Sequence, residues 1–188
     1  MEQYTYQNCL NDVLKEIANV FGAIQPEQAE RIIDLIGRAK KIFVIGRGRS
    51  GYMMQGLCMR LVHLGYNAHY VGDVCTPRIE EEDLLIVGSG SGATASIVCL
   101  ADKAKSLGAK VALLTLSRES PLQERADAVL VIPGFSPGNK SSGFDSIQPM
   151  ASLFEECLEL CCEVLVTTIF VRKGLTNEEI SRNHTNIE

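Results

Sequence analysis

The chain has 188 residues, a net charge of −5 and 46% hydrophobic composition, with an isoelectric point near 5.3. This length and composition predict one domain with one full core. The acidic balance argues against a nucleic-acid-binding protein, which needs a basic surface. The polar first residues lack a signal-peptide core, and Glu159 and Glu163 interrupt the longest apolar tract, residues 157–171. We therefore expect a cytoplasmic protein without a membrane span.

The seven cysteines are odd in number and include no C-x-x-C pair. Cys58, Cys99, Cys157 and Cys161 fall in apolar segments with helical spacing, which indicates buried, reduced thiols. Cys157 and Cys161 are one helical turn apart, but no further ligands lie near them in the sequence. We predict no metal site.

Apolar periodicity predicts helices that alternate with buried strands. An amphipathic helix is expected over residues 8–21, and a second helix starts near Pro26. The expected strands are residues 41–45, 67–71, 83–87, 110–116 and 128–132. A helix is expected to follow the first strand and to end near Leu64, and a second is expected over residues 95–107. A short helix is expected within residues 121–126. Apolar strands alternating with helices indicate a largely parallel sheet that is covered on both faces.

An irregular loop, residues 133–146, separates these strands from the last part of the chain. A long helix is expected over residues 148–173, and Thr176 opens a last short helix toward His184. We therefore expect one domain over residues 1–188. It consists of N-terminal helices (about 8–38), a core (about 40–134) and a long helix with a tail (about 148–188).

A loop of glycines and hydroxyls at residues 88–94 follows the third strand and precedes a helix. Backbone N–H groups in such a loop, together with a helix start, attract an anion. No G-x-x-x-x-G-K-[ST] occurs, so the loop suits a phosphate monoester better than a nucleoside triphosphate. We assign phosphate binding to Ser89, Gly90, Ser91 and Thr94. The alternative is a flexible surface linker, which need not sit between a buried strand and a helix.

A second glycine turn, residues 46–51, follows the first strand and satisfies G-x-G-x-x-G, with Asp73 placed where a dinucleotide fold holds the ribose. A dehydrogenase, however, needs a substrate domain for which 188 residues leave little room. Two such turns at neighbouring strand ends would instead converge on one small polyanionic ligand. We assign its binding in this turn to Gly48, Arg49 and Ser50.

Both turns belong to a wider resemblance to the sugar isomerase (SIS) family. Residues 46–51, Met59-Arg60-Leu61-Val62-His63, and residues 88–92 with Thr94 carry it. Two more specific motifs, Gln148-Pro149-Met150-Ala151-Ser152-Leu153-Phe154-Glu155 and the tail His184-Thr185-Asn186-Ile187-Glu188, are similar to the 6-phospho-3-hexuloisomerases of that family. The resemblance covers nearly the whole chain. It departs at Ala93, where many relatives carry a glutamate, so no catalytic role is placed there.

The resemblance implies an α/β fold: a flavodoxin-like three-layer α-β-α sandwich around a five-stranded parallel sheet. It also implies a homotetramer without a metal or organic cofactor. The implied reaction interconverts D-arabino-3-hexulose 6-phosphate and fructose 6-phosphate, in the ribulose monophosphate route of formaldehyde fixation or detoxification. A functional link to 3-hexulose-6-phosphate synthase follows from that route.

This reaction needs a proton acceptor at C2 and a donor at C3. A carboxylate in a partly apolar pocket suits both because burial raises its pKa. Glu155 is the candidate; alternatively, it is a helix-start carboxylate favoured by the helix dipole. Because the tail motif also matches the family, His184 is the second catalytic candidate. It could open the sugar ring or shuttle protons, and it could act in the site of a neighbouring subunit. The alternative is an exposed histidine in the tail. Glu156 is expected to face solvent or a subunit contact, and Arg47 is an alternative to Arg49.

The sequence leaves two alternative functions open. A sedoheptulose 7-phosphate isomerase is the nearest enzymatic rival, and the motif at residues 148–155 and the tail argue against it. The other rival is a sugar-phosphate sensor that binds without turnover. Such modules usually need a partner domain, for which this chain has no room.

Overall fold

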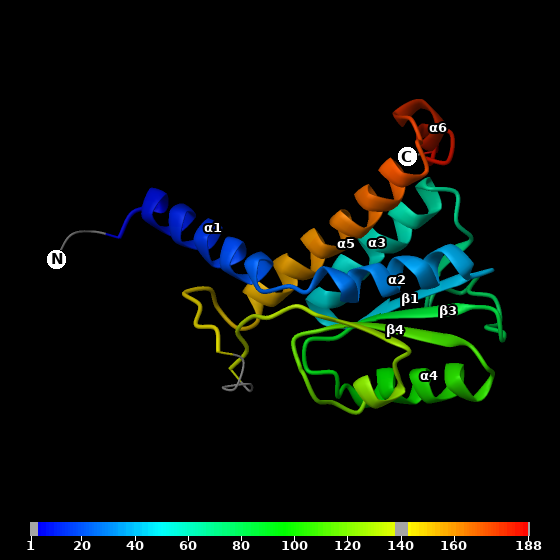
Figure 1. Cartoon of the computed structure of the whole chain (residues 1–188), viewed down its shortest axis with the longest axis horizontal. Helices are drawn as coiled ribbons and strands as arrows, with labels where there is room; N and C mark the ends of the chain where they lie inside the picture. The colour runs from blue at the N-terminus through cyan, green and yellow to red at the C-terminus, as the bar shows by residue number, and fades with distance from the viewer. Residues whose placement is uncertain (1–3, 138–142, 188) are drawn as a thin grey trace.

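The computed structural model describes residues 4–137 and 143–187 (Figure 1). Its centre is a five-stranded sheet in the order β2-β1-β3-β4-β5, in which all neighbouring strands run parallel. The strands are β1 (Ile42–Gly46), β2 (Ala68–Tyr70), β3 (Leu84–Gly88), β4 (Lys110–Thr115) and β5 (Ala128–Val131). This 2-1-3-4-5 order is the flavodoxin-like one, and it confirms the predicted fold class.

Helices cover both faces of the sheet, so the molecule has three layers (Figure 1). One face packs against α2, α3 and α5, while α4 and a short 3₁₀ helix, η1, cover the other. The helices and η1 are α1 (Tyr6–Gly22), α2 (Pro26–Arg38), α3 (Gly48–His63), α4 (Ala95–Ser106), η1 (Gln123–Arg125), α5 (Ser152–Arg172) and α6 (Asn177–Ser181). In Figure 1, most of α1 projects away from the sheet.

Alternation of side chains along the strands divides the core in two. In β1, Ile42 and Val44 join the cluster beneath α2, α3 and α5, whereas Phe43 and Ile45 join the cluster beneath α4. Successive side chains of a strand point to opposite faces, so a strand buried on both sides reads as a continuous apolar run. This is why the strands were predicted within about two residues of their ends.

The prediction of one helix over residues 148–173 is wrong at its start, because α5 begins only at Ser152. Met150 has a φ of 58°, in the left-handed region that a helix cannot include. Its side chain is 73% exposed, so it does not belong to the apolar stripe of α5. The last helix is also shorter than predicted. It opens with the expected capping box of Thr176 and Glu179 but ends at Ser181 rather than near His184.

Three of the four cysteines expected to be buried are buried, but Cys99 is exposed, as is Cys75. In the part of the chain that the structure describes, no group of His, Cys, Asp or Glu could hold a metal ion. Within the same ranges, no helix is long and apolar enough to cross a membrane.

Gly46, at the end of β1, allows the first turn of α3 to approach the strand closely. A Cβ at this position would lie 2.8 Å from the backbone oxygen of Ser50 and 2.9 Å from the backbone nitrogen of Gly51. Both contacts are with backbone, so they cannot be relieved by rotating a side chain. The turn therefore requires glycine where strand and helix meet.

We expect Gly46→Ala to lower the free energy of unfolding by about 1–3 kcal/mol, the usual cost of overpacking. Gly37→Ala is the matched control, since a Cβ on this exposed residue of α2 would meet nothing within 4 Å. It should raise stability by about 0.5–1 kcal/mol. Urea unfolding monitored by circular dichroism measures both, and a Gly46→Ala protein as stable as the parent would contradict the close approach.

Candidate active site

The two glycine turns meet at the carboxyl edge of the sheet. Gly46 and Gly88 end the neighbouring strands β1 and β3 and are paired in register. The chain after Gly46 enters α3 at Gly48, and the chain after Gly88 forms the loop that leads to α4. The predicted convergence of both turns is therefore observed, at the edge where α/β proteins of this class bind their ligands.

Hydrogen bonds fix the shape of the loop after β3. The backbone N–H of Ser89 donates to Leu114 of β4 (3.0 Å), and the buried Thr115 hydroxyl donates to the Gly90 carbonyl (3.2 Å). Gly92 has a φ of 62°, and a Cβ there would collide with the Ser120 side chain. The role of Thr115 could not be predicted from the sequence, because Thr115 acts from another strand. The loop is a preformed cradle rather than a linker.

The predicted ligands in this cradle differ in exposure. Ser89 is buried, and its Oγ accepts the N–H of Gly92 (3.2 Å), so it shapes the loop. Ser91 is exposed. Thr94 is half-buried and precedes α4, yet its side chain caps no N–H of that helix. The two hydroxyls best placed to donate to a bound anion are therefore those of Ser91 and Thr94.

The first turn of α5 packs directly onto this loop. A Cβ at Gly90 would lie 3.2 Å from the ring of Phe154, which is 1% exposed. Phe154 also lies against Gly134, where an added Cβ would be 3.5 Å from the Phe154 Cβ. This packing places the start of α5, and with it the neighbouring Glu155, beside the loop after β3.

Glu155 is paired with Arg49 from the first turn of α3. The Arg49 Nη1 lies 3.1 Å from the Glu155 Oε2 and donates a hydrogen bond to the Ser152 Oγ (2.7 Å). The Arg49 side chain is 49% exposed and that of Glu155 only 16%. Among the described residues, Arg47 has no ion-pair partner of this kind, and it is the exposed residue that precedes α3. Of the two arginines left open by the sequence, Arg49 is thus the one beside Glu155.

Burial raises the pKa of Glu155, and this is the largest influence on it. The Arg49 guanidinium acts in the opposite direction and lowers the pKa, whereas the charge of Glu156 raises it. The net result is a pKa above the ordinary value of a glutamate. A carboxylate with a raised pKa is a stronger base than a free one.

Of the two expectations for Glu156, a solvent-facing side chain is not observed, and a subunit contact stays a prediction. Glu156 is half-buried, and its Oε2 is buried without a hydrogen-bond partner among the described residues. Ser50, one of the predicted ligands, is buried in the first turn of α3. Gly48 opens the same helix with a φ of 57°. Ser152, which the sequence analysis left without a role, joins the site through Arg49.

His184 lies at the other end of α3. Its ring stacks on that of His63, with centroids 4.9 Å apart, and the neighbouring Asn183 donates to the His63 carbonyl (3.1 Å). Arg49, by contrast, is at the start of α3, 14 residues before His63. At 1.5 Å per residue, these two positions are about 21 Å apart. Figure 1 likewise shows α6 and the C-terminus at the far end of α3 and α5. Glu155 and His184 of one chain therefore do not meet.

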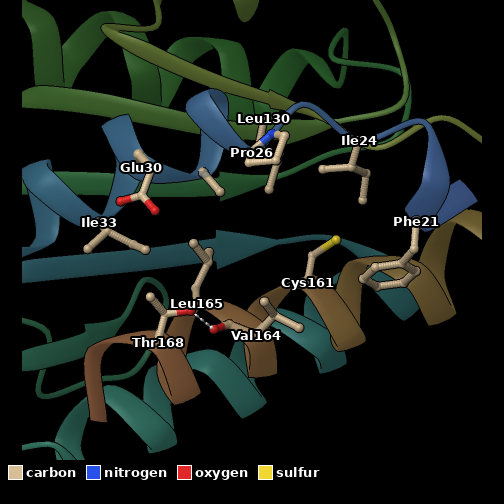
Figure 2. Close-up of a pocket in the computed structure, with 11 residues that line it drawn as sticks. Phe21, Ile24, Pro26, Glu30, Ile33, Leu130, Cys161, Val164, Leu165 and Thr168 are labelled. Atoms are coloured by element: carbon tan, nitrogen blue, oxygen red, sulfur yellow. Dashed lines mark hydrogen bonds between the residues drawn. The ribbon is translucent and has the colours of Figure 1, made fainter. Parts of the chain in front are cut away.

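A separate pocket of about 240 Å³ lies between α2 and α5 (Figure 2). Its lining is almost entirely apolar: Phe21, Ile24, Pro26, Ala29, Ile33, Leu130, Cys161, Val164 and Leu165, with Glu30 and Thr168. Glu30 is bound by Arg172 through two hydrogen bonds of 2.7 Å. Such a lining does not suit a phosphorylated sugar, so the edge of the sheet remains the candidate site.

Comparison with known proteins decides the family. The SIS domain matches residues 35–160. The chain belongs to the SIS domain family. It is 43% identical over 178 residues to the 3-hexulose-6-phosphate isomerase of Bacillus subtilis, covering 94% of this chain and 96% of that one. The family resemblance predicted from the motifs is thereby confirmed.

Other relatives agree over nearly the full length. The 3-hexulose-6-phosphate isomerase of Mycobacterium gastri is 37% identical, covering 96% of this chain and 90% of that protein. A Methanococcus jannaschii crystal structure, described as inferring a molecular function of 3-hexulose-6-phosphate isomerase, superposes with a TM-score of 0.83 at 32% identity. That comparison covers 95% of this chain and 98% of the other.

We expect Arg49→Gln to raise the pKa of Glu155 further, because the neighbouring positive charge that lowers it is removed. As the pH falls, Glu155 should therefore take up its proton at a higher pH in the variant than in the parent. Carbon-13 NMR titration of the side-chain carboxyl measures this directly. Arg47→Gln is the control and should leave the titration unchanged. Equal midpoints in the parent and Arg49→Gln would contradict the pairing.

Proposed function

We propose that this protein is an isomerase that interconverts D-arabino-3-hexulose 6-phosphate and fructose 6-phosphate. The observation that carries the proposal is the pairing of Glu155, a partly buried base, with Arg49 beside the glycine cradle. The full-length relatives named 3-hexulose-6-phosphate isomerase supply the substrate. They also favour it over sedoheptulose 7-phosphate and over a sensor without turnover.

In the proposed reaction, the phosphate is bound by Ser91, Thr94 and the backbone of the loop, with Gly48 and Ser50 shaping the facing turn. The Glu155 carboxylate takes the proton from C2, the C2–C3 double bond forms, and the C3 oxygen takes a proton from solvent water, which the C2 hydroxyl later returns. The resulting enediol accepts the proton from Glu155 at C3 and loses the proton of its C2 hydroxyl, which leaves the carbonyl at C2. The Arg49 guanidinium stabilises the negative charge that develops on the oxygen atoms. These are proton transfers that require no cofactor.

We expect Glu155→Gln to lower kcat by about 10²–10⁴-fold, the usual contribution of a general base, while fructose 6-phosphate still binds. Turnover is followed from 3-hexulose 6-phosphate generated in place, with fructose 6-phosphate as the readout, with and without a chelator. Glu159→Gln is the matched control: burial also raises the pKa of Glu159, which lies one turn along α5 against Gly56. A Glu155→Gln enzyme with parental turnover would contradict the assignment, and a parent that binds but does not turn over would favour a sensor.

We further propose that the active protein is a homotetramer in which His184 of one subunit completes the site of another. The separation of about 21 Å between the two ends of α3 supports this, because one chain cannot bring His184 to its own Glu155. Exposed apolar side chains on α1 and α5, among them Leu14 and Val164, also favour assembly. We propose that this enzyme works in the cytoplasm, downstream of 3-hexulose-6-phosphate synthase.

Mixing inactive subunits tests the shared site. Glu155→Gln and His184→Ala proteins should each be inactive alone. Unfolded together in equal amounts and refolded, they should recover about a quarter of the parental activity, since random assembly gives one intact site in four when two subunits supply the two residues. Each variant refolded alone is the control. If the mixture stays as inactive as its components, Glu155 and His184 do not act in a site shared between subunits.

A further inference from the structure

Glu16 of the N-terminal helix α1 is hydrogen-bonded to the segment that precedes α5. We propose that Glu16 of α1 is a positioning residue that holds the segment in front of α5 and thereby sets the place of Glu155. The role of Glu155 in this inference rests on the proposed function; the clamp itself is read from the contacts.

Three groups of one short segment donate to the Glu16 carboxylate. The Ser146 hydroxyl donates to Oε2 (2.7 Å), the backbone N–H of Ile147 to Oε1 (2.7 Å), and the Gln148 amide to Oε2 (3.2 Å). The Ser146 Oγ in turn accepts the backbone N–H of Gln148 (3.0 Å). Both oxygens of Glu16 are thus used by residues about 130 positions further along the chain.

The segment bound by Glu16 has no regular secondary structure to hold its shape. Residues 143–151 belong to no helix or strand. Within them, Met150 adopts the left-handed conformation, which is unfavourable for a residue with a Cβ, and its exposed side chain gains little from packing. Such a conformation persists only where the surroundings determine it. We attribute the conformation of Met150 to the buried Gln148 and to Glu16, which accepts a hydrogen bond from the Gln148 amide.

Backbone hydrogen bonds connect this segment directly to the first turn of α5, which carries Glu155. The N–H of Ser152 donates to the Pro149 carbonyl (3.2 Å), and the N–H of Glu155 donates to the Ala151 carbonyl (3.1 Å). The first turn of α5 is therefore built on the residues that follow Gln148. A shift of about 1 Å in a reacting group can lower a rate by about 10²-fold. Loosening the clamp should thus act on the chemical step.

The test compares Glu16→Ala with Glu30→Ala. Both changes remove a carboxylate that ties an N-terminal helix to the chain around α5, but Glu30 binds Arg172 at the far end of that helix. We expect Glu16→Ala to lower kcat by about 10–100-fold with little change in KM, because the phosphate cradle is untouched. Glu16→Gln keeps an acceptor for the Ile147 N–H and should restore part of kcat. Glu30→Ala should keep the parental kcat.

A second readout requires no substrate. Hydrogen–deuterium exchange should become faster over residues 146–155 in Glu16→Ala and not in Glu30→Ala. Equal exchange in the two variants, or a parental kcat in Glu16→Ala, would overturn the proposal. If the parent shows no isomerisation, the proposed function fails; faster exchange over this segment then still supports the clamp, and unchanged exchange still refutes it.

Discussion

The packing of Phe154 between Gly90 and Gly134 holds the start of α5 against the glycine cradle. Everything proposed for the site depends on this contact, because Glu155 follows Phe154 and is carried with it to Arg49. The absence of a side chain at Gly90 is what lets an aromatic ring come so near the loop. The proposed phosphate site and the proposed carboxylate base are thereby brought together from segments more than 60 residues apart in sequence.

Burial raises the pKa of Glu155 and the neighbouring guanidinium lowers it, and this balance suits the proton transfer that we propose. Full burial without Arg49 would keep the carboxyl protonated, and full exposure would leave it a weak base. The greater exposure of Arg49 keeps it from cancelling the effect of burial. Among the described residues, Ser152 and Glu155 are the hydrogen-bond and ion-pair partners of the Arg49 guanidinium, and in the proposed reaction this group stabilises the developing oxyanion.

The strands and the two turns could be predicted because buried parallel strands are continuous apolar runs and each ends at its turn. The strand order came only with the family resemblance, since no pattern in β1 or β3 specifies its neighbour. The start of α5 could not be predicted: Pro149 and Met150 suit a helix by residue type, and the left-handed turn follows Gln148, whose partner Glu16 is far away in the sequence. The choice of Arg49 over Arg47 and the roles of Thr115 and Ser152 likewise rest on contacts across many residues. The roles of Glu155 and His184 remain proposals.

The cysteines of α3 and α5 have a chemical consequence. Burial raises the pKa of Cys58 to about 11 and those of Cys157 and Cys161 to about 12, and it raises that of Cys162 well above its ordinary value. Because the thiolate is the nucleophile, these four sulfurs are nearly inert toward aldehydes and other electrophiles at neutral pH. Reaction in the folded chain is directed to the exposed Cys75 and Cys99. The buried thiols of a protein proposed to work where formaldehyde is consumed are thus protonated and do not react with the aldehyde.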